Sequence, residues 1–166
     1  MPDLSYVFFD TVATGTAAFD ALLFQVARGA DATHTDDFTN MVSSGAFPAG
    51  QKFVIDHIGV IIEPALTPAD ADALFHASLL QVLINSQVDF WCPLTEVVDN
   101  SGWTGFNNLA AGAGLQVTGS FSDGFMLKIP INVDGGVGFG VRIKTTVATA
   151  VSSKLVCSLT GTYTRQ

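Results

Sequence analysis

The sequence predicts an all-β protein whose C-terminal part is an antiparallel sheet. Three runs carry that prediction, because apolar side chains alternate in them with polar or small ones at a period of two residues. The runs are Phe125 to Val133, Val137 to Ile143 and Leu155 to Thr160. This alternation is typical of strands with one buried face. Asp134-Gly135-Gly136 joins the first two runs, so we expect a hairpin there, with Ile129 on its buried face.

The first fifty residues combine a strand-like segment with a long loop. Residues 4–12 are rich in aromatic and β-branched side chains, and we expect there either a first strand or an N-terminal arm spanning residues 1–21. Leu22 to Ala27 is a short apolar run. Arg28 to Gly50 is rich in Asp, Ser, Thr and Gly, which predicts a loop. Long loops of this kind are common where a protein makes contacts.

The apolar parity changes within the strand that we predict for Phe53 to Glu63. Phe53 and Ile55 share one parity, whereas Ile58 and Val60 share the other. A change of one residue is what a β-bulge or a bend between two sheets produces.

One helix is predicted, over Pro68 to Ala77. Thr67 offers a hydroxyl N-cap, Pro68 suits the first helical position, and Asp70 places negative charge near the helix N-terminus. The face expected to pack against a sheet consists of Ala71, Leu74 and Phe75.

The remaining segments complete the fold prediction. Leu79 to Phe90 predicts a strand pair or a bent strand, with a turn at Asn85-Ser86-Gln87, and Asp99 to Ser122 predicts a long crossing loop with a strand at Leu115 to Thr118. Seven to nine strands, one short helix and long connections predict a single jelly-roll β-sandwich or barrel. A chain of 166 residues can form this as one domain, residues 1–166, with a sizeable core.

Composition limits the partners that we expect. The formal net charge is −8 and the seven Lys and Arg residues form no cluster, so we expect no direct nucleic-acid binding and no attraction to an anionic membrane. No apolar run approaches the ~20 residues of a membrane span, and we expect no secretory signal. Apolar residues make up 48% of the chain and charged residues 13%, about half the usual share of charge. This favours a surface hidden in an assembly, with a monomer under a neutral polar surface as the alternative.

Residues that commonly carry chemistry are scattered, and we predict no catalytic residue, no cofactor and no metal site. His34, His57 and His76 lack the His-x-His pair of a cupin-type metal site. The Gly-x-Ser-x-Gly motif of a nucleophile elbow is absent. Cys92 and Cys157 each lie in a strand-like run, so we expect buried free thiols, with a disulfide as the alternative.

Other polar and aromatic groups have structural interpretations. The acidic group Asp31, Asp36 and Asp37 predicts a solvated loop, with a structural cation as the alternative, because its spacing matches no EF-hand. Asp70 and Asp72 fit a helix N-terminus. No helix follows the C-terminal glycines, so they form no phosphate loop. Those glycines are Gly135, Gly136, Gly138 and Gly140. We expect Trp91, Trp103, Phe106 and Phe121 in the core, with an aromatic platform for sugars as the alternative.

Motifs along most of the chain resemble the capsid proteins of tailless phages. The opening consists of Leu23-Phe24-Gln25-Val26-Ala27-Arg28-Gly29, Asp37-Phe38-Thr39-Asn40-Met41 and Gln51-Lys52-Phe53-Val54-Ile55. A Phe-x-Ile-x-x-Ile-Gly-Val strand (Phe53 to Val60), the Pro-initiated helix and a strand unit ending in Pro-Leu (Leu79 to Leu94) follow. The close consists of Leu-x-x-Pro-Ile (Leu127 to Ile131), Gly-Gly-x-x-Phe (Gly135 to Phe139) and a last strand ending in Gly161 to Arg165.

The family that these motifs resemble is the single jelly-roll major capsid proteins of icosahedral phages with an internal membrane, such as those of Thermus. The resemblance implies an upright β-barrel that associates into dimers and capsomers. It also implies contact with other capsid proteins and with the internal viral membrane, and a place in the virion capsid after synthesis in the host cytoplasm. The chain has no basic segment, so the resemblance supports no contact with the genome.

We therefore expect a viral structural protein, a small major capsid protein that self-assembles into the icosahedral shell, and not an enzyme. Residues 1–21 and the loop Asp99 to Ser122 are expected to lose solvent exposure on assembly, because they are apolar without periodicity. One alternative is a carbohydrate- or receptor-binding β-sandwich module of a virion. Another is a cupin-like metalloenzyme.

Overall fold

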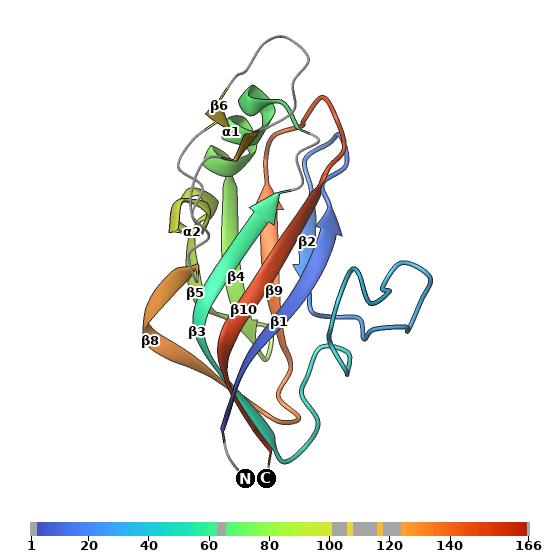
Figure 1. Cartoon of the computed structure of the whole chain (residues 1–166), viewed down its shortest axis with the longest axis vertical. Helices are drawn as coiled ribbons and strands as arrows, with labels where there is room; N and C mark the ends of the chain where they lie inside the picture. Colours follow the sequence, from blue (N-terminus) through green and yellow to red (C-terminus); the bar gives the residue numbers. More distant parts are fainter. Residues whose placement is uncertain (1–2, 63–65, 101–105, 108–115, 118–123, 166) are drawn as a thin grey trace.

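Two antiparallel four-stranded sheets face each other in the computed structural model, which describes residues 3–62, 66–100, 106–107, 116–117 and 124–165 (Figure 1). The first sheet has the strand order β1 (Leu4–Ala13), β10 (Lys154–Arg165), β3 (Gln51–Ile62) and β8 (Phe125–Asp134). The second has the order β2 (Asp20–Leu23), β9 (Phe139–Thr145), β4 (Ser78–Ile84) and β5 (Gln87–Pro93). The short strands β6 (Phe106–Asn107) and β7 (Gln116–Val117) pair with each other, and β7 falls within the strand predicted for residues 115–118. The all-β prediction is confirmed.

Apolar side chains that alternate along the strands fill the space between the sheets. In β10, Leu155, Cys157 and Leu159 are buried, whereas Val156 and Ser158 between them are half-buried. The period of two predicted for this run is confirmed, and it places one face of the strand in the core.

An aromatic cluster joins the two sheets within this core. The ring of Phe8 lies 4.9 Å from the rings of Phe47 and Phe53, and Phe47 stacks on Phe139 of β9 at 4.9 Å. Aromatic pairs at this separation add about 0.5–1.5 kcal/mol each beyond the area that they bury. The residues at this end of the core therefore stabilise both sheets at once.

β3 carries the bulge that its change of parity predicts. Its register against β8 shifts between Ile55 and His57, and its register against β10 shifts opposite Thr160 and Gly161. Gly161 is required there, because a Cβ at this position would lie 1.9 Å from the carbonyl oxygen of Val54. The bulge keeps apolar side chains on the inner face at both ends of a long strand.

The hairpin predicted around Asp134-Gly135-Gly136 is wrong. β8 pairs with β3, whereas β9 pairs with β2 and β4, so residues 134–138 cross from one sheet to the other. The turn packs against the chain before β3, where Gly136 N donates to Phe47 O, and a Cβ at Gly135 would lie 2.3 Å from Pro48 O. These contacts hold the turn against the chain before β3, so that β8 and β9 enter different sheets. Ile129, expected on the buried face, is 81% exposed.

Helix α1 (Pro68–His76) begins where the sequence predicts it. The Thr67 side chain accepts a hydrogen bond from Asp70 N at 3.1 Å, and Ala77 is the C-cap. Its packing face is buried as expected, with Ala71, Leu74 and Phe75 between 0% and 4% exposed.

A second helix, α2 (Leu94–Asn100), corrects the prediction of one helix only. Leu94, Val97 and Val98 are buried, and they place the helix against β3, β8 and α1. Paired valines favour strands locally, so packing and not propensity selects the helix here. Among the helices that the structure describes, none is long and apolar enough to cross a membrane.

The N-terminal segment is a strand. β1 pairs with β10 along its whole length, from Leu4 with Tyr163 to Ala13 with Lys154. The long loop predicted for Arg28 to Gly50 is confirmed, because these residues form only isolated bridges. One bridge joins Asp10 to Thr39, so the loop is tied to the sheet that it flanks.

Candidate functional site

The three histidines lie in separate parts of the fold. His57 is in β3, His76 ends α1, and His34 lies in the long loop. Their carboxylate contacts are local: His34 Nδ1 lies 2.8 Å from Asp31 and His76 Nε2 lies 3.4 Å from Asp72. Across the described residues, no group of three His, Cys, Asp or Glu side chains could hold a metal ion.

The acidic loop is organised around Asp31. Its carboxylate accepts hydrogen bonds from the backbone N–H groups of Thr33 and His34, each at 2.8 Å, and from the Thr33 hydroxyl at 2.7 Å. These bonds hold the pKa of Asp31 well below its usual range. Asp36 lies 3.4 Å from the guanidinium of Arg28. Asp31, Asp36 and Asp37 are all exposed, as expected for a solvated loop.

Cys92 in β5 and Cys157 in β10 are buried free thiols, as predicted. Burial, with the charge of Glu96 added, raises the pKa of Cys92 to about 11. Burial and the charge of Asp10 also raise the pKa of Cys157. Because the thiolate is the reactive form, neither thiol is activated as a nucleophile near neutral pH.

Asp10 is a buried carboxylate that sequence reasoning missed. Its Oδ2 accepts a hydrogen bond from Phe24 N at 2.5 Å, and its Oδ1 accepts one from Thr11 N at 2.9 Å. Burial raises the pKa of Asp10, and these hydrogen bonds oppose the rise. The signal was its parity, since Asp10 alternates with the same phase as Phe8 and Val12. Its role is structural, because it ties β1 to the residue that follows β2.

The outer face of the second sheet is the candidate binding surface. Cross-strand pairing aligns Leu22, Arg142, Gln81 and Trp91 in one row across four strands. The neighbouring row is Asp20, Lys144, Leu79 and Pro93. Large apolar side chains are exposed in both rows, 40% for Leu79 and 63% for Trp91. Arg142 Nε lies 3.3 Å from Asp20 Oδ1 without the geometry of a hydrogen bond. This face therefore combines apolar contact area with two cationic side chains.

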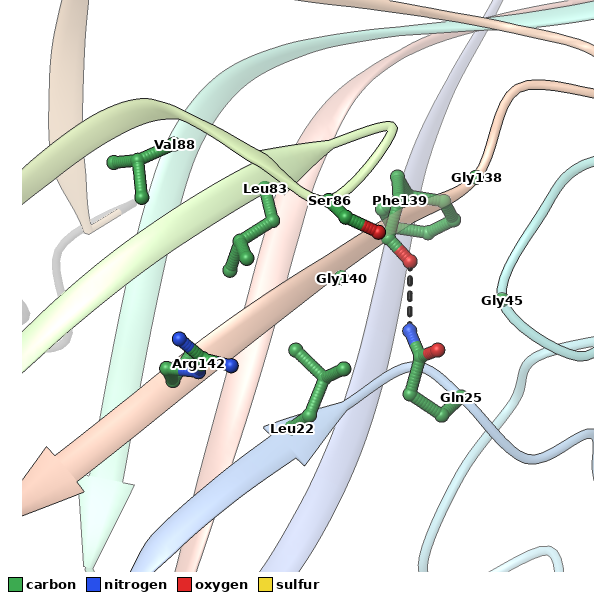
Figure 2. Close-up of a pocket in the computed structure, with 10 residues that line it drawn as sticks. All are labelled: Leu22, Gln25, Gly45, Leu83, Ser86, Val88, Gly138, Phe139, Gly140 and Arg142. Atoms are coloured by element: carbon green, nitrogen blue, oxygen red, sulfur yellow. Dashed lines mark hydrogen bonds between the residues drawn. The ribbon is translucent and has the colours of Figure 1, made fainter.

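A pocket of about 220 Å³ opens on this face beside the β4–β5 turn (Figure 2). Gln25 Nε2 donates to Phe139 O at 2.7 Å in its wall. A Cβ at Gly140 would lie 2.6 Å from Gln25 Nε2, so a side chain there would displace the Gln25 amide. Arg142 and Ser86 add a guanidinium and a hydroxyl. The described lining is Leu22, Gln25, Gly45, Leu83, Ser86, Val88, Gly138, Phe139, Gly140 and Arg142. Its polar side chains are therefore an amide, a hydroxyl and a guanidinium, which can donate hydrogen bonds to a bound molecule.

The turn that borders the pocket is where the sequence predicts it. Asn85 and Ser86 have φ values of 49° and 65°, the left-handed backbone of a type I′ hairpin turn. β4 and β5 pair on either side of it, which confirms the strand pair predicted for Leu79 to Phe90.

The predicted aromatic core group is only partly described. The expectation that Trp91 is buried is wrong, because β5 is an edge strand and its indole points to the outer face. Trp103 and Phe121 lie outside the described residues, and Phe106 is described only as part of β6. In the loop predicted for Asp99 to Ser122, residues 101–105, 108–115 and 118–123 likewise lie outside the described residues, whereas residues 99–100 are the end of α2.

Comparison with known proteins finds no protein-family model and no curated protein that matches this chain.

Proposed function

We propose that this protein is a structural subunit of a virion, a small major capsid protein with a single jelly-roll domain that self-assembles into the shell. The proposal includes contacts with further copies and with other capsid proteins, contact with an internal viral membrane, and no enzymatic activity. No direct contact with nucleic acid is proposed.

Strand order supports the jelly-roll part of the proposal. Without the short β6 and β7, eight strands remain, and in chain order they form sheets of order one-eight-three-six and two-seven-four-five. Two four-stranded sheets that exchange strands in this way are typical of jelly rolls, a class that includes viral capsid, lectin and cupin domains. The strand order therefore supports a jelly-roll fold. Because one fold serves many functions, the capsid role has to be argued from the protein surface.

The single observation that carries the assembly proposal is the exposed apolar surface on both sheets. Large apolar side chains of the first sheet are exposed, including 54% of Leu4, 46% of Val7 and 69% of Met126. The second sheet exposes Trp91 and Val88, at 63% and 47%. Leu4 and Val7 lie on the β1 edge of the first sheet and Met126 on its β8 edge, so apolar side chains are exposed at both edges of this sheet. Neighbouring copies that cover these edges would remove the side chains from water. Because only 13% of the residues are charged, electrostatic repulsion between the exposed apolar faces of two copies is weak.

Two measurements test this proposal. Light scattering coupled to size-exclusion chromatography, run across a range of concentrations, is expected to show oligomers. Mass spectrometry of purified particles is expected to find the chain as an abundant component. A protein that stays monomeric at every concentration and is missing from particles would contradict the proposal.

The exposure of Trp91 favours carbohydrate binding as a second candidate function. Its indole shares a row with Gln81 and Arg142, so an apolar ring lies beside hydrogen-bond donors, the combination that sugars require. A glycan array with wild type and Trp91→Ala tests this. Binding that disappears in the variant supports the candidate, and an array without hits opposes it.

A further inference from the structure

An apolar groove lies at the edge of the sandwich where β5 and β8 meet. These strands end opposite sheets at the same side of the molecule (Figure 1). The ring centroids of Phe90 in β5 and Phe125 in β8 lie 5.9 Å apart. The groove has a volume of about 490 Å³. Its apolar lining includes Phe90, Phe125, Met126, Leu127, Ile129 and Ile131. We call it the edge groove.

β8 departs from its neighbour where it lines the groove. Between the pairs Ile55–Ile131 and His57–Met126, β8 advances five residues while β3 advances two. Residues 127–130 therefore form a bulge that has no partners in the β3 ladder. The bulge turns Ile129 outward, so that it is 81% exposed while Leu127 and Ile131 stay buried.

Ile129 is the most exposed large apolar side chain among the described residues, and Met126 beside it is 69% exposed. Removing a side chain of this size from water contributes about 1.5–3 kcal/mol. An apolar protrusion thus stands next to an apolar recess on one strand. The protrusion of one copy could therefore fill the recess of a second copy, and the reverse.

The groove also carries one acidic and one basic side chain, which can pair between two copies. Asp89 of β5 and Lys128 of β8 both line the groove and are exposed, and neither forms an ion pair with another described residue. In a two-fold symmetric contact, residue i of one copy meets residue j of the other, and the reverse. Two such grooves can therefore pair Asp89 with the partner's Lys128 twice.

We infer that the edge groove binds the edge groove of a second copy of this chain, with Ile129 of each copy seated in the recess of the other. The inference rests on the proposed function and names one of its contacts. Pro130 has no N–H and interrupts any added strand ladder at this edge. The contact is therefore made by side chains and closes at two copies, without extending into a fibre.

The size of the groove sets the strength that we expect. It offers nine residues on each copy, against about 20–30 in a standard interface. The isolated pair should therefore be a concentration-dependent dimer, which neighbouring contacts in a shell reinforce by raising the local concentration.

The first test is Ile129→Arg, with Val42→Arg as its matched control. Both residues are β-branched and exposed, and Val42 (57% exposed) lies in the long loop, away from the groove. Sedimentation velocity is expected to show the dimer dissociation constant raised about tenfold or more by Ile129→Arg and unchanged by Val42→Arg. Equal effects of the two variants, or an unaffected Ile129→Arg dimer, would overturn the inference.

The second test uses charge reversal and mixing. Asp89→Lys and Lys128→Asp each place like charges across the two-fold axis, so each variant alone should dimerise more weakly than wild type, and more weakly still at low salt. Mixed together, they form opposite pairs at both positions and should dimerise again. Failure of the mixture to dimerise would also overturn the inference.

These outcomes separate the inference from the proposed function. If wild type enters particles and Ile129→Arg enters them equally well, the edge groove is not the contact and the capsid role stands. If wild type dimerises as described and is missing from particles, the contact stands and the capsid role fails.

Discussion

Asp10 shows how a single buried residue determines the path of a loop. It stands where an apolar side chain is expected, and its two carboxylate oxygens accept the backbone N–H groups of Phe24 and Thr11. Phe24 has a φ of 65° and is fully buried, so the chain turns sharply after β2 at the point where Asp10 binds it. A buried N–H without an acceptor costs about 1–3 kcal/mol. The hydrogen bond from Phe24 N to Asp10 avoids this cost, which offsets the burial of the carboxylate.

We expect Asp10→Asn to destabilise the protein most at acidic pH. The pKa of Asp10 is raised in the folded state, so its protonated form is favoured there. The stability that this protonation contributes is present below the unfolded pKa and is lost as the pH rises through the folded pKa. The asparagine does not titrate, and its amide leaves one N–H without an acceptor. Urea unfolding from pH 4 to pH 8 should show a difference of about 1–2 kcal/mol at low pH that shrinks as the pH rises.

Asp36→Asn is the control for this measurement, because the Asp36 side chain is 82% exposed. Its effect should stay within about 0.5 kcal/mol at every pH. A difference between Asp10→Asn and wild type that grows with pH would contradict the expectation.

Gly161→Ala should be strongly destabilising. A Cβ at residue 161 would lie 1.9 Å from Val54 O, and backbone on both strands would have to move. We expect a loss of at least about 2 kcal/mol in the free energy of unfolding. Gly138→Ala is the matched change, because its nearest neighbour would be 3.9 Å away, and it should be nearly neutral. Chemical denaturation of the two variants measures this difference. Similar denaturation midpoints for Gly161→Ala and Gly138→Ala would refute this account of the bulge.

At the scale of elements, α1 shows local signals and packing in agreement. The Thr67 hydroxyl accepts a hydrogen bond from Asp70 N, and Leu74, one turn after Asp70, is completely buried. α2 shows the reverse case, because Val97 and Val98 favour a strand by propensity but are buried in a helix. The start of α1 should therefore respond to its cap.

Thr67→Ala should lower the free energy of unfolding by about 1 kcal/mol, because the N–H of Asp70 loses its acceptor. Thr67→Ser keeps the hydroxyl and should retain most of the stability. Thermal unfolding followed by circular dichroism measures both variants. If serine and alanine destabilise equally, the hydroxyl is not the reason that the helix begins at Pro68.

At the scale of the whole molecule, the two sheets close over one continuous core. Cys92 lies in an edge strand of the second sheet and Cys157 in an inner strand of the first, and both belong to this core. A single core predicts that both thiols become accessible in the same unfolding transition.

A thiol-reactive disulfide reagent at pH 8 tests this prediction. In the native protein both thiols should react slowly, since the pKa of Cys92 is raised to about 11 and that of Cys157 is also raised by burial. In increasing urea, both should become reactive at the midpoint seen by circular dichroism. Reaction of Cys92 well before that midpoint would mean that β5 opens separately from the rest of the sandwich.

Local sequence patterns were sufficient to predict several secondary-structure features of this protein. The period of two predicted the buried face of β10, the change of parity predicted the bulge in β3, and Thr67-Pro68 predicted the start of α1. Each of these features depends on side chains only a few residues apart.

The tertiary structure alone decided which strand pairs with which. β8 and β9 are neighbours in the sequence and lie in opposite sheets, because contacts with Phe47 and Pro48 hold the turn between them. The exposure of Ile129, which follows from the bulge of β8 against β3, and the hydrogen bond of Asp10 with Phe24 also depend on segments that are distant in the sequence. Alternation specifies that one face of a strand is buried, but a strand's hydrogen-bonding partner comes from distant parts of the chain, where local periodicity carries no information.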